Sequence, residues 1–285
     1  MSKLAFAIVA FGLFIPTGFA QDAGRASSPS AARTAGKVVL VEGDARFRDQ
    51  AGAERRPKVG DPIYEGDRLL TGADGEVHVA MGDGGYIGVR PNTEMSIDLF
   101  VAEGGTSDRS EISLVKGSFR TITGWIGKAQ AALIRTFDAT IGIRGTDHEP
   151  LVILPGVGDG EPGTYDRVHI GATVIRTATG SAELKAGQAG YAPRGAGIPP
   201  RVLAIIPEFF RPAKNEARFV GLHDLIQERL EKLRLERGRS GDARGDRQDR
   251  GAARPDRSGR PDKADPPARP PLPDRAVDRP GRPVK

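Results

Sequence analysis

The sequence predicts an all-β protein, built as a multi-stranded sandwich or a β-solenoid-like domain and followed by one amphipathic helix and a disordered tail. Apolar residues alternate with polar ones along segments such as residues 39–47 and 76–81, which is the period of a strand with one buried face. Turn dipeptides such as Asp74-Gly75 and Asp83-Gly84 separate these segments, and their glycines supply the positive φ that tight hairpins need. Short strands at this spacing favour a sandwich, barrel or solenoid over alternating β and α units.

The first twenty residues read as a secretory signal peptide. An apolar run from Leu4 to Pro16 follows the single cation Lys3 and ends in the small-residue stretch Thr17-Gly18-Phe19-Ala20, which is typical of a cleavage site. The alternative, an uncleaved membrane anchor, needs about 20 apolar residues. We therefore expect cleavage of residues 1–20 and no transmembrane span in the mature protein, which would be periplasmic or secreted.

The β domain is expected over residues 36–200, after a flexible lead-in of Ala- and Ser-rich sequence at residues 21–35. This length suffices to bury the core of one domain or of two small ones. The chain has no cysteine, so it offers neither a disulfide nor a thiolate metal ligand, and in an oxidising compartment its core alone must hold the fold.

Residues 136–148, TFDATIGIRGTDH, carry the most distinctive pattern. Ile141 and Ile143 alternate with Gly142 and Arg144, so one face of a strand is apolar and the other carries a gap and then a long cation. Arg144 stands between Gly142 and Gly145, where missing side chains allow another backbone or a ligand to approach. Two roles stay open: Arg144 ties together turns such as those at residues 60–61 or 66–67, or Arg144, Gly142 and Gly145 contact an anion or a partner protein.

This run resembles the closing stretch of the FecR-type periplasmic domain. Further family-like segments occur in the same order along the chain: Gly60 to Gly72, Asp83 to Thr93, and Leu114 to Arg120 with Gly124. The resemblance covers residues 36–148, and Gly163 to Ala192 resembles the continuation found in exported single-domain members.

The resemblance implies an exported, non-enzymatic binding or scaffolding module of the bacterial cell envelope. FecR-type regulators also carry a cytoplasmic segment that binds a sigma factor. The expected signal peptide leaves no room for that segment, so the anti-sigma role is not carried over. The alternative function is a periplasmic signal-relay component that contacts an outer-membrane receptor or a membrane regulator, and an envelope enzyme ranks third.

The sequence holds no catalytic or metal-binding motif that predicts an enzyme, a cofactor or a metal site. Ser113 and Lys116 have the S-x-x-K spacing of penicillin-recognising enzymes, but in a strand their side chains face opposite sides. Asp147, His148 and Glu149 are three neighbouring metal-ligand types. Successive side chains of an extended chain point alternately to opposite faces, so these three are not expected to converge on one ion.

One amphipathic helix is predicted over residues 215–237. Asn215 can cap it, apolar residues recur at three- and four-residue steps from Phe219 to Leu233, and Gly238 follows its end. The apolar stripe either packs on the β domain or serves self-association or a partner protein.

The remaining tail, residues 238–285, is predicted to be disordered because it has almost no apolar side chains to bury. Counted from Arg237, it carries 14 basic and 8 acidic residues, a net charge of +6, whereas the whole chain has +5. The tail is either a solvated spacer or a tether to anionic envelope polymers or lipid headgroups. Nucleic acid is not an expected partner, because an exported chain is separated from the chromosome and the tail has no aromatic ring for base stacking.

Overall fold

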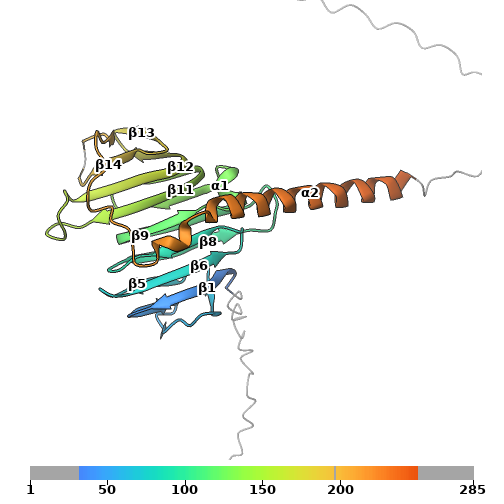
Figure 1. The fold of residues 1–285 in the computed structure, drawn as a ribbon, viewed down its shortest axis with the longest axis horizontal. Coiled ribbons are helices and arrows are strands. Elements are labelled where there is room, and N and C mark those ends of the chain that lie inside the picture. Colours follow the sequence, from blue (N-terminus) through green and yellow to red (C-terminus); the bar gives the residue numbers. More distant parts are fainter. Residues whose placement is uncertain (1–31, 196, 250–285) are drawn as a thin grey trace, which may run out of the picture. The chain divides into compact units, whose positions relative to one another are not determined.

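The computed structural model of the protein describes residues 32–195 and 197–249 (Figure 1). The predicted signal peptide, most of the predicted lead-in and residues 250–285 of the predicted tail lie outside the described residues. The chain divides into two units, which meet between Arg234 and Leu235. In the second unit the structure describes residues 235–249, which are helical.

The first unit confirms the predicted all-β class, and a single long helix ends the described chain. Its strands begin two residues before the expected domain start and end two residues after its expected end. They are β1 (Thr34–Glu42), β2 (Ala45–Arg48), β3 (Glu54–Arg55), β4 (Pro62–Tyr64), β5 (Arg68–Thr71), β6 (Glu76–Met81), β7 (Tyr86–Val89), β8 (Glu94–Val101), β9 (Arg109–Ile122), β10 (Ala132–Arg135), β11 (Thr140–Ile153), β12 (Gly163–Thr177), β13 (Gly180–Lys185), β14 (Ala189–Pro193) and β15 (Arg201–Val202). One helical turn, α1 (Trp125–Lys128), interrupts them.

The strands form two layers that share three long strands. The first layer runs in the order β4-β1-β6-β7-β9-β11-β12-β14-β15. The second layer runs in the order β3-β2-β5-β8-β9-β10-β11-β12-β13. The strands β9, β11 and β12 each contribute one half to each layer, so the two layers are continuous and enclose one core.

Glycines mark the points where β11 and β12 pass from one layer to the other. Gly145 has φ +55° and Gly171 has φ +84°, both in the left-handed region that side chains disfavour. The register between the two strands shifts between Arg144 and Asp147. A Cβ atom on Gly171 would lie 2.2 Å from the carbonyl oxygen of Gly145, so the two bends also depend on the close approach of the two backbones.

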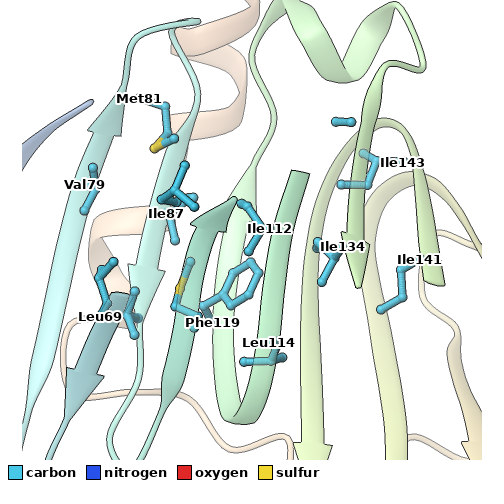
Figure 2. Close-up of a cluster of buried hydrophobic side chains, with 14 of the residues drawn as sticks. Leu69, Val79, Met81, Ile87, Ile112, Leu114, Phe119, Ile134, Ile141 and Ile143 are labelled. Atoms are coloured by element: carbon cyan, nitrogen blue, oxygen red, sulfur yellow. The ribbon is translucent and has the colours of Figure 1, made fainter. Parts of the chain in front are cut away.

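The core lies between the two layers. Figure 2 shows Val79, Met81 and Ile87 of the first layer together with Leu114 and Ile141 of the second. All five side chains are at most 8% exposed. The buried positions alternate along β5 and along the first half of β11, as the sequence pattern predicts. The predicted alternation is wrong for β6, where Glu76 and His78 are buried as well as Val77, Val79 and Met81.

The C-terminal helix differs from its predicted bounds. The predicted start, Asn215, precedes a short 3₁₀ helix (η1, Glu216–Phe219), Gly221 then adopts φ +70°, and the α-helix α2 covers Leu222–Asp249. Asn215 does not cap the α-helix, because its side-chain amide donates a hydrogen bond of 3.1 Å to Glu76. The helix also continues beyond the predicted end at residue 237 and beyond Gly238.

The apolar side chains of this segment pack on the β domain, as one of the two alternatives for the helix predicts. Phe219, Ile226 and Leu230 are buried against Ile122 and Tyr86 of the first layer. Leu225, on another face of α2, is 63% exposed. Among the described residues, no helix is both long enough and apolar enough to cross a membrane.

Candidate functional site

The predicted contact residues Arg144, Gly142 and Gly145 lie together on the second-layer half of β11. The Arg144 side chain is 50% exposed, and its ion-pair partner is Glu183 of β13, at 4.0 Å. The prediction that Arg144 ties the turns at residues 60–61 or 66–67 together is wrong. Asp67 is held instead by Arg55, whose guanidinium donates two hydrogen bonds to its carboxylate. Arg144 therefore stays a candidate for contact with an anion or a partner.

Successive side chains of the run Asp147 to Glu149 point to opposite faces of β11, as predicted. Asp147 and Glu149 face away from the core, and His148 faces into it, paired with Val168 and Thr121 on the neighbouring strands. In residues 32–195 and 197–249 no group of three or more His, Cys, Asp or Glu side chains is arranged to hold a metal ion.

A polar cluster lies on the core side of this strand. Nδ1 of His148 and Oδ1 of Asp166 are 2.8 Å apart, and the hydroxyl of Thr173 donates a hydrogen bond of 2.6 Å to Oδ2 of the same carboxylate. All three residues are fully buried. The cluster joins β11 to both halves of β12, so its geometry is that of a structural cross-link between the layers.

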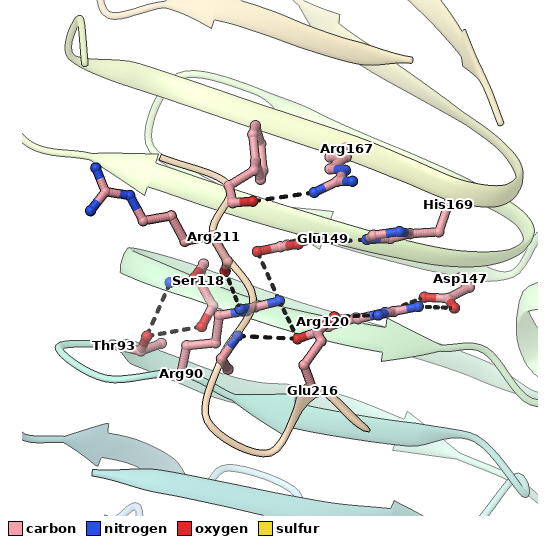
Figure 3. A network of polar contacts seen from close by, with 12 residues as sticks. Arg90, Thr93, Ser118, Arg120, Asp147, Glu149, Arg167, His169, Arg211 and Glu216 are labelled. Atoms are coloured by element: carbon pink, nitrogen blue, oxygen red, sulfur yellow. Dashed lines mark hydrogen bonds and ion pairs between the residues drawn. The ribbon is translucent and has the colours of Figure 1, made fainter. Parts of the chain in front are cut away.

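A larger charged network lies on the outer face of the first layer (Figure 3). Arg120 of β9 donates hydrogen bonds of 2.8 and 2.6 Å to the two carboxylate oxygens of Asp147. Arg90 is 3.1 Å from a carboxylate oxygen of Glu149. Both guanidiniums also bind Glu216, at 3.0 Å from Arg90 and by a direct hydrogen bond from Arg120.

Glu216 belongs to a segment that crosses this face, residues 203–234, which we call the strap. Its first part packs Phe209 and Phe210 against Tyr165 and Tyr191 of the first layer. Its middle is anchored through carbonyl oxygens, because Arg167 donates to the carbonyl of Phe210 at 3.2 Å and Arg90 to that of Arg211 at 2.8 Å.

Phe219 of the strap packs into a site formed by His78, Tyr86, Gly88 and Arg120, which we call the aromatic seat. The Phe219 ring lies 5.6 Å from the ring of His78 and 5.5 Å from that of Tyr86, and the guanidinium of Arg120 lies 4.7 Å from its centroid. Gly88 forms the floor of this seat, because a Cβ atom there would lie 2.7 Å from the Phe219 ring. His78 is held in place by Glu76 at 2.6 Å and by Tyr86 at 2.9 Å.

The electrostatics of the network favour charged carboxylates. Burial raises the pKa of Glu216, but the attraction of Arg90 and the hydrogen bond from Arg120 outweigh burial, so the net pKa lies below the ordinary value. Burial lowers the pKa of Arg120, yet Asp147 and Glu216 reverse the effect and raise it. The Arg90–Arg120 pair is therefore a binding site for a carboxylate, and Glu216 of the strap occupies it.

Sequence reasoning missed this site because its partners are far apart in the chain. Arg120 and Glu216 are 96 residues apart, and Arg90 and Glu216 are 126 apart. One local signal was present: Asp147 and Glu149 occupy alternate positions of a strand whose other face was already polar at His148. A strand that is polar on both faces and still buried requires a covering segment.

The family comparison matches the centre of the β domain. Residues 67–154 match the family model described as FecR protein. This stretch is similar to the FecR domain. It contains Arg90, Arg120, Asp147 and Glu149, whereas the strap lies outside it. The match begins at Asp67, so it covers the resemblance drawn over residues 36–148 only in part. No curated protein matches the chain.

Solved structures give distant likenesses. Two crystal structures of a proposed anti-sigma factor from Parabacteroides distasonis align at 14% identity over 48% of this chain, with TM-scores of 0.36 and 0.37. The alignment spans 57% of the length of those solved chains. A cell surface anchoring domain aligns at 31% identity over 22% of this chain and 82% of its own, with a TM-score of 0.21.

Proposed function

We propose that this protein is a non-enzymatic binding or scaffolding module of the bacterial cell envelope, exported by its signal peptide. The observation that carries the proposal is that a face of the β domain already binds a polypeptide segment, the strap, through paired arginines and an aromatic seat. A face of this kind suits the recognition of protein chains. The match to the FecR family supports an envelope setting.

The non-enzymatic part of the proposal rests on how the reactive groups are engaged. Asp147 and Glu149 are bound by arginines, and His148 is fully buried beside Asp166. A general acid or base must reach its substrate, and these groups face either the strap or the core. The proposal therefore assigns them to holding the structure and its bound segment.

The second-layer surface around Arg144 is the proposed contact for a partner that the strap does not compete with. Arg144 is half exposed and its ion pair with Glu183 is 4.0 Å long. A second cation lies beside it, because a Cβ atom on Gly142 would be 2.9 Å from the guanidinium of Arg176. A planar guanidinium suits a carboxylate or phosphate of an envelope protein or an anionic envelope polymer.

Photo-crosslinking in living cells tests the proposal. A photoreactive residue placed at Arg144 should give a discrete adduct in the envelope fraction, and the same residue at the exposed Arg46 of β2 serves as the matched control. A mature protein that gives no adduct from Arg144, or adducts of equal yield from both positions, contradicts the proposed contact.

Signal relay is the alternative function, and the FecR match supports it. The resemblance to FecR-type regulators implies that the domain receives a signal from an outer-membrane receptor. Transcript profiling after gene deletion separates the two. Relay predicts a changed set of sigma-dependent transcripts that Arg144→Ala reproduces, whereas scaffolding predicts altered envelope assembly without such a set. Turnover of an envelope substrate by the purified protein would instead favour the enzyme, which ranks third.

A further inference from the structure

We infer that the outer face of the first layer is a peptide-recognition site. The strap occupies this site in cis. From a partner protein, the site accepts an acidic residue followed three positions later by an aromatic one. The inference rests on the proposed binding function and names the chemistry of its ligand. In the strap, Glu216 and Phe219 supply this pattern.

The first argument is that the strap is bound as a ligand is, through side chains. Leu203 donates one backbone hydrogen bond to Ala189 of β14. From Leu203 to Arg234, the described strap makes no other backbone-to-backbone hydrogen bond to the strands. Beyond that point, sheet arginines hold its carbonyls and its carboxylate. A segment outside the strand ladder can detach without breaking the sheet.

The second argument is that two positions of the sheet are matched to the pattern. The guanidiniums of Arg90 and Arg120 converge on one carboxylate, and bidentate or paired arginines are selective for that group. Gly88 lacks a side chain where the aromatic ring sits, and Arg120 lies over that ring. The acid and the ring are recognised by adjoining groups, which fixes their spacing.

The third argument is that the strap fills the face incompletely. Nε of Arg90 is buried without a hydrogen-bond partner. The buried Nε2 of His169 is 3.6 Å from a carboxylate oxygen of Glu149, beyond hydrogen-bonding distance, and buried polar groups without a hydrogen bond are unfavourable. A groove of about 520 Å³ remains beside the strap, lined by Glu76, Arg90 and Ser118 of the sheet and by residues 211–214 of the strap. A partner peptide with more polar atoms can satisfy these groups.

A cis ligand competes strongly, because its tether gives it an effective concentration on the order of millimolar. The wild-type chain should therefore bind a peptide in trans only weakly. Weakening the strap while leaving the sheet unchanged should reveal the site, since the apparent affinity rises with the fraction of open molecules.

The test uses a synthetic peptide of residues 209–222 and the full mature chain, with binding measured by fluorescence anisotropy. The double variant Glu216→Ala with Phe219→Ala empties the carboxylate site and the aromatic seat and keeps every sheet residue. We expect it to bind the peptide at least ten-fold more tightly than the wild type. Leu225→Ala, at an exposed position of α2, is the matched control and should bind as the wild type does.

Three results would overturn the inference: equal affinity of the wild type and the double variant, equal binding of a peptide in which the acid and the ring are replaced, or retained binding after Gly88→Val is added to the double variant. A wild-type dimer that the double variant abolishes would assign the site to a second copy of the chain and also overturn it. Circular dichroism verifies the fold, and Glu216→Gln, which preserves side-chain volume, replaces the double variant should that unfold.

The outcome is independent of the Arg144 experiment. Peptide binding can fail while the adduct from Arg144 persists, in which case the protein binds partners through its second layer. Peptide binding without an adduct from Arg144 would support the peptide site and contradict the Arg144 contact.

Discussion

At the residue scale, the two glycines at the bends of β11 and β12 make different demands on their positions. Gly145 has a left-handed φ, but the nearest atom to a Cβ there is 3.6 Å away, on Lys128. Gly171 has a left-handed φ as well, and a Cβ there would lie 2.2 Å from a backbone oxygen. Backbone strain acts at both sites, and a steric clash acts at Gly171 alone.

We therefore expect Gly171→Val to destabilise the fold more than Gly145→Val does. A β-branched residue at positive φ loses about 1–2 kcal/mol from backbone strain, and the clash at residue 171 should raise the loss well above about 2 kcal/mol. Chemical denaturation of both variants measures the difference, with Gly105→Val, at an open position without positive φ, as the control. Equal midpoints for the three variants would contradict the expectation.

The two arginines compared above, Arg144 and Arg55, should behave in opposite ways. Arg144→Ala should change the free energy of unfolding by less than about 0.5 kcal/mol, since an exposed ion pair at 4.0 Å contributes little. Arg55→Ala leaves the carboxylate of Asp67, which is 2% exposed, without its cation and should destabilise by about 2 kcal/mol or more. Thermal melts of both variants test this. A large loss for Arg144→Ala would restore the structural role that its position between glycines first suggested.

The sequence predicted the orientation of residues on one strand and missed contacts between distant strands. The alternation of Ile141, Ile143 and the Asp147–Glu149 run follows from the strand period alone. The partner of Asp67 depends on which strands become neighbours, and the period carries no information about that. Arg55 meets Asp67 because β2 pairs with both β3 and β5, a pairing that only the folded topology defines.

At the element scale, the strap should respond to pH through its acid. The pKa of Glu216 is lowered in the folded state, so its contribution to stability is fully present above the ordinary pKa of a glutamate, about 4.3, and is lost as the pH falls through the lower folded value. We expect hydrogen exchange of residues 203–234 to speed up between about pH 5 and pH 3 relative to the strands. Glu216→Gln should flatten this dependence.

Asp83 acts in the opposite sense and provides an internal control. Burial raises its pKa, and hydrogen bonds from Gly85 and Ile126 reverse this only in part. Because its pKa is higher in the folded than in the unfolded state, protonation of Asp83 favours folding, and the contribution of Asp83 to the free energy of unfolding rises as the pH falls. A loss of protection that is equal in the strap and in the hairpin around Asp83, or one that persists unchanged in Glu216→Gln, would contradict the role of Glu216.

The helix illustrates how element bounds depend on tertiary contacts. The apolar residues from Phe219 to Leu233 left two roles open, and Phe219, Ile226 and Leu230 pack on the β domain, whereas Leu225 of the same predicted stripe is 63% exposed. The predicted start failed because Asn215 binds Glu76 instead of capping a helix, and Gly221 separates η1 from α2. The seat for Phe219 fixes η1 against the sheet, and no local signal in residues 215–221 encodes that contact.

At the scale of the whole molecule, the processing of the N-terminus tests the export on which the proposed function depends. The apolar run ends in small residues at Ala20, so we expect cleavage there and a mature chain that begins at Gln21 in the periplasmic or secreted fraction. Intact mass spectrometry of the protein recovered from that fraction measures it. A membrane-bound species that retains Met1 would contradict both the cleavage and the envelope assignment as stated.

Residues 237–285 hold a net charge of +6, while the rest of the chain sums to −1. As a tether to anionic polymers, this segment should bind heparin or lipopolysaccharide, and deleting residues 250–285 should weaken that binding without changing the melting temperature of the β domain. Counterion release should make the affinity fall steeply between about 50 and 200 mM salt, although the eight acids of the segment blunt the slope. Titration of the full-length and the truncated protein at both salt levels decides it: equal affinity, or affinity indifferent to salt, would assign the segment to the spacer role.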